Sequence, residues 1–198
     1  MTTSARPYHH GDLRRRLLET AETVLEREGA AALSLRELAR TLEVSHNAPY
    51  RHFPTRDALL AAIAEAGYRD LAERLASAGT GLPTREATMA RGLAYIGFAL
   101  ERRAVFRLMF TADIESPAHP GLRDSAHDSL QTASGQIAAA FGDDALGDAT
   151  LSAWAFVHGL AAILLDGQVP TALREGRSDL EVAKGVIGTM MHALSGHA

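Results

Sequence analysis

The feature that most restricts the fold of this 198-residue chain is a crowding of helix signals near the N-terminus. Apolar side chains recur at helical spacing over residues 12–28, where Asp12 can cap the first turn and Gly29 ends the helix. Ser34 and Glu37 match a capping box, in which the two side chains satisfy free amides of a first turn, and they predict a second helix to about residue 42. Two helices therefore follow each other with almost no chain between them.

A third and a fourth helix follow just as closely. The segment 43–45 is long enough only for a tight turn, and Ser45 or Asn47 is expected to cap a short third helix that ends near His52. A Phe-Pro-Thr sequence then breaks the chain, and Thr55 is expected to cap a fourth helix that continues to about residue 77. A helix, a tight turn and a second helix at a steep angle form the geometry with which helix-turn-helix proteins enter the major groove of DNA. An ordinary helical corner gives the same pattern, so geometry alone leaves both interpretations open.

The side chains of this corner suit its expected packing. Ala39 is small where the second helix would cross the third, and Val44 is apolar in the turn. Tyr50 and Phe53 are aromatic and are expected to anchor the third helix to the core.

Two residues predict irregular backbone at the corner. Glu43 stands in the turn where glycine is often found, so we expect a left-handed conformation there. Pro49 lies inside the third helix, which should therefore begin late, at His46 or Asn47, or open irregularly.

Beyond residue 78 the chain again favours helices. It is rich in Ala and Leu and only 6% aromatic, a composition that suits helices better than strands. Residues 78–83 form the clearest linker, and Ser178 with Glu181 forms a second capping box. The helices expected in this part are 84–101, 102–112, 120–141, 144–166 and 178–195. We therefore predict an all-α fold.

The chain divides by these signals into a head and a body. We expect a three-helix N-terminal domain at residues 1–56, a connecting helix at 57–78 and a larger helical domain at 79–198. The net charge of −4 is unevenly shared: the first 56 residues carry nine basic and seven acidic side chains, and the remainder carries eleven and seventeen. A basic head on an acidic body is a pattern that a DNA-binding head produces.

Nothing in the sequence indicates an enzyme. The absence of cysteine excludes disulfides, thiol catalysis and Cys-ligated zinc, and fits a reducing compartment. There is no nucleophile elbow, phosphate-binding loop, His-Glu-x-x-His motif or dinucleotide fingerprint. The nine histidines lack metal-ligand spacing, so we expect no metal and no cofactor. Without a signal peptide or a run of about 18 apolar residues, we expect a cytoplasmic protein with no membrane segment.

The corner residues resemble a known family. The run from Val44 to Leu60, preceded by residues 33–39, resembles the signature of TetR-family transcriptional regulators. The most specific part is a tyrosine, any residue, His-Phe, two residues, a basic residue, two residues and a leucine, which this chain has at residues 50–59. The resemblance is strong over about residues 11–61. In the body it rests on helix count and on the string from Trp154 to Leu160, which is similar to the Trp-His-Gly class of TetR effector domains.

The resemblance implies a DNA-reading role for the third helix. Asn47 is the best candidate for a base contact, because an asparagine amide pairs bidentately with adenine. Arg56 is expected to bind phosphate at the start of the fourth helix, and residues 6–10 are expected to form a basic arm. The expected DNA-binding residues are Ser34, Arg36, Ser45, His46, Asn47, Ala48, Tyr50, Arg51, His52 and Arg56.

The resemblance also implies an effector pocket in the body, where bulky side chains concentrate on three predicted helices. A packed core is the alternative for these side chains, and Arg102, Arg103 and Arg107 either set the polarity of a ligand or form a solvated face. The expected effector-binding residues are Tyr95, Phe98, Phe106, Met109, Phe110, Trp154 and His158.

Small residues at close spacing on the last two helices are typical of helices that approach closely, and predict a homodimer through them. The expected function is that of a DNA-binding regulator, a repressor that a small-molecule effector releases from a palindromic double-stranded operator. The alternatives are a helical protein-interaction scaffold and a small helical enzyme, neither of which would bind DNA.

Overall fold

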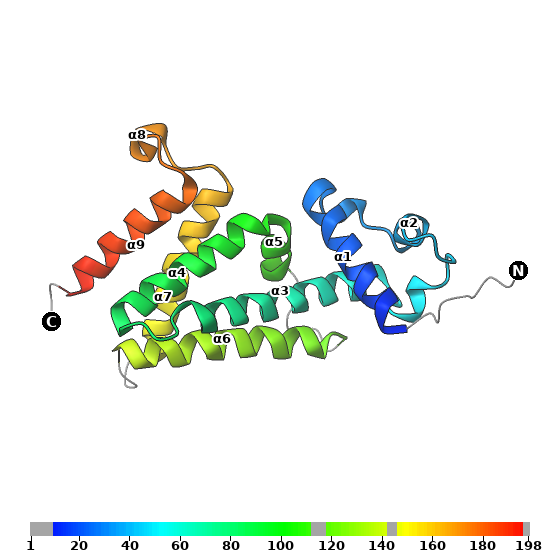
Figure 1. The fold of residues 1–198 in the computed structure, drawn as a ribbon, viewed down its shortest axis with the longest axis horizontal. Helices are drawn as coiled ribbons and strands as arrows, with labels where there is room; N and C mark the ends of the chain where they lie inside the picture. The colour runs from blue at the N-terminus through cyan, green and yellow to red at the C-terminus, as the bar shows by residue number, and fades with distance from the viewer. Residues whose placement is uncertain (1–9, 112–117, 142–145, 196–198) are drawn as a thin grey trace, which may run out of the picture.

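The computed structural model describes residues 10–111, 118–141 and 146–195, and over these ranges every regular element is a helix. Figure 1 shows an elongated molecule with the N-terminal elements gathered in a head at one end and the remaining helices in a body at the other. Helix α3 (Arg56–Ala78) runs from the head into the body. The prediction of an all-α chain with an N-terminal helical domain is confirmed. The expected arm, apart from His10, and the first residues of the helix expected at 144–166 lie outside the described residues.

The head is built from two helices and two 3-10 turns around apolar side chains. Helices α1 (His10–Glu28) and α2 (Leu35–Thr41) are joined by the 3-10 turn η1 (Ala30–Ala32), and a second 3-10 turn, η2 (Pro49–Arg51), precedes α3. Gly29 ends α1 with a positive φ of 81°, as predicted. The buried apolar residues of the head include Leu13, Leu17, Ala21, Leu25, Leu33, Leu35, Leu38, Phe53 and Leu59.

Two of the predicted caps at the head differ in outcome. The Thr55 hydroxyl accepts a hydrogen bond from the Ala58 amide at 3.0 Å and caps α3, as predicted. Asp12 does not cap α1, because the helix already begins at His10; its carboxylate instead pairs with Arg15 at 2.6 Å.

The two predicted capping boxes also differ. Ser34 precedes α2 but its hydroxyl makes no capping hydrogen bond, and Glu37 pairs instead with Arg40, 2.6 Å away on the next turn. The capping box predicted there is wrong, because a cation on the same helix takes the carboxylate. Before α9 (Asp179–Ser195) the box forms: the Glu181 carboxylate accepts from the Ser178 amide at 2.8 Å, and the Ser178 hydroxyl accepts from the Glu181 amide at 3.4 Å.

The third helix of the head is not an α-helix. Residues 46–48 form a turn that leads into the single 3-10 turn η2. Pro49 has no amide hydrogen to offer the Ser45 carbonyl, which accepts from the Ala48 amide at 2.9 Å instead. Glu43 has a φ of 54°, in the left-handed region. The left-handed backbone at Glu43 and an irregular opening at Pro49 are therefore confirmed. The cap predicted for Ser45 or Asn47 is wrong, because the residue before η2 is Ala48 and no side chain caps the turn.

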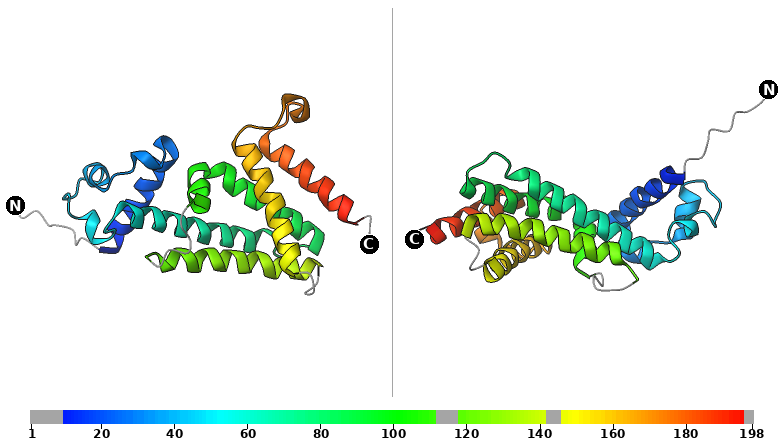
Figure 2. Two further views of the ribbon diagram at one scale, coloured as in Figure 1. Left: turned by 180° about the vertical axis from the view of Figure 1, so that it is seen from behind. Right: turned by 90° about the horizontal axis from the view of Figure 1, so that it is seen from below.

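The body packs its long helices around α3 and α4 (Thr84–Glu101). Helix α6 (Pro120–Phe141) lies along α3, as both views of Figure 2 show, and α7 (Leu146–Leu165) and α9 pack on α4. Helix α5 (Arg103–Thr111) crosses α3 closely at Gly67, where an added Cβ would lie 2.7 Å from the Met109 sulfur. The helices expected in the body are confirmed to within a few residues over the described ranges.

One element of the body was not predicted. The short helix α8 (Thr171–Arg174) lies within the connection between α7 and α9 that the sequence marked only with Pro170 and flanking glycines. Its four residues are too few to carry a periodic apolar pattern, which is why periodicity missed it.

Candidate nucleic-acid interface and body cavity

The tip of the head displays a row of polar side chains on a buried support. Ser45, His46, Asn47, Tyr50 and Arg51, which we call the recognition turn, are all exposed. The proline between them is fully buried and, with the aromatic ring that follows η2, holds the turn on the head core. The donors and acceptors of the recognition turn therefore face solvent from a fixed backbone, as side chains that read DNA must.

Tyr50 does not anchor the corner as expected. Its side chain is 41% exposed, and Pro49 takes the place in the core that the aromatic ring was predicted to fill. Phe53 does act as an anchor: it is 2% exposed, and the Arg14 guanidinium lies 5.3 Å from the centre of its ring. The exposed position of Tyr50 suits the DNA contact that the family resemblance implies.

Arg56 has an internal role that sequence reasoning missed. Its guanidinium donates to the Leu33 carbonyl at 3.2 Å and also to the Ala30 carbonyl, so it ties the start of α3 to the connection between α1 and α2. The side chain remains 42% exposed. Both bonds use atoms that would otherwise be available to a phosphate.

The other predicted DNA-binding residues differ in how far their side chains are exposed. Arg36 is exposed in the first turn of α2, and Ser34 just before it is half-buried. Ala48 and His52 flank η2 and are also half-buried.

The body contains a half-open cavity of about 750 Å³ between α3, α4, α6 and α7, with one side chain from α5. Three of the predicted effector residues, Tyr95, Phe110 and Trp154, line it. Most of the other described lining residues are aliphatic. Arg91 on α4 also lines the cavity, and no sequence pattern distinguishes it from the chain's many surface arginines.

The remaining predicted effector residues lie behind the cavity wall. Phe98, Phe106 and Met109 are buried in the core and are not among the lining residues. Each therefore fits the packed-core alternative that the sequence left open.

His158 supports the wall from behind. Its Nδ1 lies 2.9 Å from the Tyr95 hydroxyl, and its ring packs 5.4 Å from Phe106 and 4.5 Å from Phe110, centre to centre. Burial lowers the pKa of His158 and raises that of Tyr95, so both groups are neutral at neutral pH. The histidine thus positions two rings that face the cavity.

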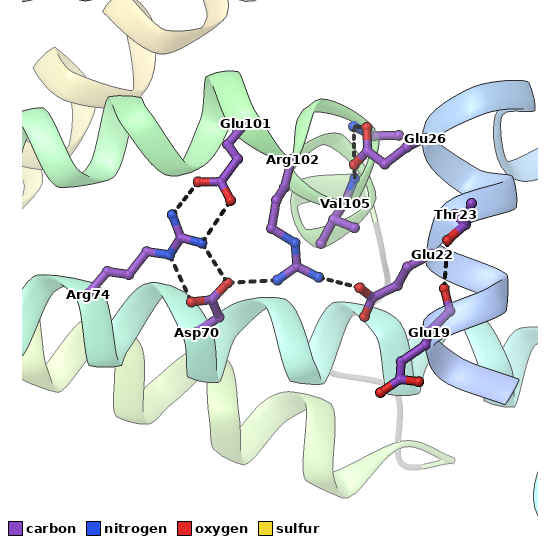
Figure 3. A network of polar contacts seen from close by, with 10 residues as sticks. Glu19, Glu22, Thr23, Glu26, Asp70, Arg74, Glu101, Arg102 and Val105 are labelled. Atoms are coloured by element: carbon purple, nitrogen blue, oxygen red, sulfur yellow. Dashed lines mark hydrogen bonds and ion pairs between the residues drawn. The ribbon is translucent and has the colours of Figure 1, made fainter. Parts of the chain in front are cut away.

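An ion-pair network joins the head to the body (Figure 3). Arg102 donates to Glu22 of α1 at 2.6 Å and to Asp70 of α3 at 2.8 Å, and Arg74 links Asp70 to Glu101. The Arg102 side chain is only 18% exposed. It therefore neither sets the polarity of the cavity nor belongs to a solvated face, the two roles that the sequence allowed for it.

Burial and charge act differently on the two carboxylates that Arg102 contacts. Burial raises the pKa of Glu22, and the adjacent Arg102 only partly offsets this. Burial alone would also raise the pKa of Asp70, but hydrogen bonds from Arg74 and Arg102 outweigh it and hold the pKa below its usual value.

A second contact fixes α5 to the head. The Glu26 carboxylate of α1 accepts hydrogen bonds from the Ala104 and Val105 amides, each at 3.0 Å. These amides belong to the first turn of α5, where free amides and the helix dipole favour a negative charge. Helix α5 therefore has one end on α1 and carries Phe110 into the cavity at the other.

Exposed apolar side chains lie on the last two long helices. On α7 they are Leu151, Trp154 and Ile163, and on α9 they are Leu180, Val186 and Met190. Some of the small residues that suggested a dimer instead serve packing within the chain: Ala183 is fully buried and a Cβ on Gly188 would lie 3.8 Å from Met89 of α4. The large apolar side chains are thus the stronger sign of an interface.

Helix α7 is also long and apolar enough to cross a membrane, judged by length and composition alone. Its segment Gly147–Leu165 has a mean hydropathy of 1.5 and is 28% buried. An apolar helix at a protein interface has the same properties, so this finding is weak evidence for a membrane segment. Within the described ranges, no three or more histidine, aspartate or glutamate side chains are grouped so that they could hold a metal ion.

Two family models match the chain. Residues 17–63 match the model described as bacterial regulatory proteins of the tetR family, and residues 88–182 match the tetracyclin repressor-like C-terminal domain. The first covers the head corner and the second covers most of the cavity and the α7 surface. No curated protein matches the sequence.

Solved structures share the fold over nearly the whole chain. A protein of unknown function from Rhodococcus sp. RHA1 is 36% identical, with a TM-score of 0.78 over 96% of this chain and 98% of that one. A regulatory protein of the tetR family from Rhodococcus RHA1 is 21% identical, with a TM-score of 0.68 over 91% and 95%. AibR, solved with isovaleryl coenzyme A and operator DNA, is 18% identical, with a TM-score of 0.65 over 89% and 97%.

The matched segments include both parts of the molecule, the corner that carries the recognition turn and the helices that enclose the cavity. The chain therefore belongs to the TetR family of bacterial transcriptional regulators.

Proposed function

We propose that the protein is a cytoplasmic, non-enzymatic repressor that binds a palindromic operator as a homodimer and leaves it when a small molecule fills the body cavity. The recognition turn carries this proposal, because its exposed polar side chains stand on a buried support at the tip of the head. AibR, whose structure contains both operator DNA and isovaleryl coenzyme A, has the same fold.

The DNA contacts divide into base reading and phosphate binding. We assign base reading chiefly to Asn47, with His46 and Ala48 beside it. Phosphate binding then falls to residues around this centre, since cations and hydroxyls at helix starts suit phosphate oxygens. The residues assigned to it are Ser34, Arg36, Ser45, Tyr50, Arg51, His52 and Arg56.

The dimer forms through α7 and α9 of each subunit. Their exposed apolar side chains, among them Ile163 and Met190, would be covered by the same surface of a second copy. Two heads held by a twofold axis match half-sites that lie about 34–36 Å apart on DNA, which is why a palindromic operator follows from the dimer.

The cavity communicates with the head through α5. An effector that presses on Phe110 acts on the helix whose first turn is bound by Glu26 of α1. The Arg102 ion pairs join the same two regions. An effector releases DNA only if it binds the state with displaced heads more tightly than the DNA-bound state. We propose that the body is of the Trp-His-Gly class, since Trp154 lines the cavity and the His158 ring lies behind it, 5.5 Å away centre to centre.

Selection of duplexes from a random library by the purified protein, followed by fluorescence anisotropy, tests DNA binding. Affinity should fall steeply with salt because counterions are released. Asn47→Ala should change the preferred sequence, whereas Arg56→Ala should weaken binding to every duplex. Arg40→Ala, on the exposed face of α2, is the matched control and should do neither. A scaffold or an enzyme would enrich no duplex, and identical effects of the first two variants would contradict the division of contacts.

Sedimentation velocity tests the dimer. Ile163→Lys and Met190→Lys should give monomers that no longer bind operator, because each places a charge in the proposed interface. Leu173→Lys on α8 is the control, since Leu173 is more exposed still but lies outside α7 and α9. Dimers that persist in both interface variants would contradict this surface.

A further inference from the structure

The charged side chains among the described residues of the cavity wall are basic. Its described lining residues are mainly aliphatic and aromatic, and none of them is acidic. Arg91 is the strong cation among them, and His127 is exposed at the edge. A cationic ligand would therefore find no charge partner in this part of the wall, and burying an unpaired charge is costly.

Arg91 is held at the cavity with bonding capacity to spare. Its Nε is buried and has no hydrogen-bond partner, and no described acidic side chain forms an ion pair with it. The guanidinium lies directly over Gly79 at the end of α3, where an added Cβ would be 2.5 Å from the Arg91 Cζ. Residue 79 without a side chain thus leaves room for the guanidinium beside the cavity.

A second polar atom of the wall is also left without a partner. Thr150 of α7 is 7% exposed, and its hydroxyl oxygen is buried without a hydrogen bond. Buried polar groups in native proteins nearly always have partners. These two atoms are covered in this structure, and each would gain a partner if its side chain turned toward a ligand in the cavity that it borders.

We infer that the effector is an apolar monocarboxylate, with its carboxylate at Arg91 and its hydrocarbon body against the apolar wall. This inference rests on the proposed function of the cavity as the effector site. An arginine fork matches a carboxylate bidentately, and a single cation balances a single negative charge. A cavity of about 750 Å³ lies within the usual range for small-molecule sites, so it has room for a medium-length chain or a ring system.

Three ligands with equal hydrocarbon chains and different polar ends test which charge the cavity prefers: decanoate, decanol and decylamine. The single tryptophan of the chain, Trp154, lines the cavity, so its fluorescence reports binding. Decanoate should bind at least about tenfold more tightly than decanol, as expected for a hydrogen bond to a charged group, and decylamine should bind most weakly. Equal or tighter binding of decylamine, or no binding of decanoate, overturns the inference.

Two variants on α4 test the position of the carboxylate. Arg91→Gln should lower the affinity for decanoate to about that for decanol and leave decanol binding unchanged. Arg85→Gln is the matched control, since Arg85 lies on the same helix and is not among the lining residues. Unchanged decanoate binding in Arg91→Gln overturns the assignment. If circular dichroism shows that this variant is unfolded, the ranking of the three ligands on the unaltered protein decides.

The same titrations with operator duplex present distinguish this inference from the proposed function. Decanoate that binds without weakening operator affinity contradicts release by the effector and leaves the ligand class standing. Operator binding without any binding of decanoate overturns the ligand class and leaves the DNA-binding function standing.

Discussion

The head and the body use their apolar residues in opposite ways. In the head, α1, α2 and two 3-10 turns pack around Leu17, Leu38 and Phe53, and the polar side chains of the recognition turn lie outside. In the body, the helices leave a cavity of about 750 Å³ among themselves, and α7 and α9 expose apolar side chains to solvent. A well-packed corner holds one geometry, whereas helices around a cavity have room to change position.

This difference suits the proposed function, in which the head reads a DNA sequence and the body responds to a ligand. The two regions meet at a polar contact, where Arg102 and Glu26 connect α1 to the body, and along α3, which supplies Leu59 to the head core and Leu71 to the cavity wall. Because α3 serves both regions, the boundaries proposed at residues 56 and 78 divide the sequence more sharply than the packing does.

The largest expected effect is the loss of unfolding free energy when an aromatic ring is removed, which should be greater for a packed ring in the head than for a cavity-lining ring in the body. Phe53→Ala should lower the free energy of unfolding by about 3–5 kcal/mol, because it empties a fully enclosed site in the head. Phe110→Ala should cost about half as much or less, since one side of that ring already faces the cavity and has fewer contacts to lose. Urea unfolding followed by circular dichroism measures both.

A result in the opposite order would break the comparison. If Phe110→Ala proved as costly as Phe53→Ala, the cavity wall would be packed as tightly as the head core, and a ligand would find little room to move it. Tryptophan fluorescence, which reports from Trp154 in the body, shows in the same experiment whether the loss is confined to the head.

The next effect concerns the contact between the two regions. Arg102→Ala should lower the free energy of unfolding by about 1–3 kcal/mol, because it leaves the partly buried Glu22 carboxylate without its cation and removes one of the two arginines that bind Asp70. Arg107→Ala removes a comparable 2.6 Å pair with Asp166, but both partners are exposed, so it should cost less than about 1 kcal/mol. Equal costs would mean that the network at Arg102 behaves as a surface ion pair.

The sequence predicted the backbone best at positions where a single residue determines the local conformation. Pro49 lacks an amide hydrogen and Glu43 follows a helix end in a tight turn, so the irregular corner follows from these two residues alone. Arg91 and Arg102 could not be separated from the other arginines, because their roles depend on helices that are distant in sequence. His158 could be placed on the same face as Trp154, but not behind the wall, since that depends on how α4, α5 and α7 meet.

A smaller effect compares the two capping boxes. Ser178→Ala should destabilise the body by about 1 kcal/mol, because the hydroxyl exchanges hydrogen bonds with Glu181 at the start of α9. Ser34→Ala should cost no more than a few tenths of a kcal/mol in the head, since its hydroxyl makes no capping bond. Thermal unfolding of the two variants under the same conditions measures the difference, and a larger loss from Ser34→Ala would show that the box before α2 forms in solution.

The smallest effect is a pH dependence that belongs to the body alone. Burial against Phe106, Phe110 and Trp154 lowers the pKa of His158 below its usual value of about 6.5. Above that value the imidazole is neutral in both folded and unfolded chains and its contribution is constant. As pH falls below it, the unfolded chain takes up a proton that the folded body resists, so stability declines until the lowered pKa is reached.

Urea unfolding between pH 7.5 and 5.5 measures this dependence. In His158→Asn the decline below about pH 6.5 should be shallower than in the unaltered protein, because the resisted proton is gone. His192→Asn on the exposed face of α9 is the control and should leave the decline as it was. If both variants show the same slope, the wall behind the cavity is open enough to water to accept a charged imidazole. The contrast between a polar exterior on the head and an apolar interior in the body then no longer holds at this position.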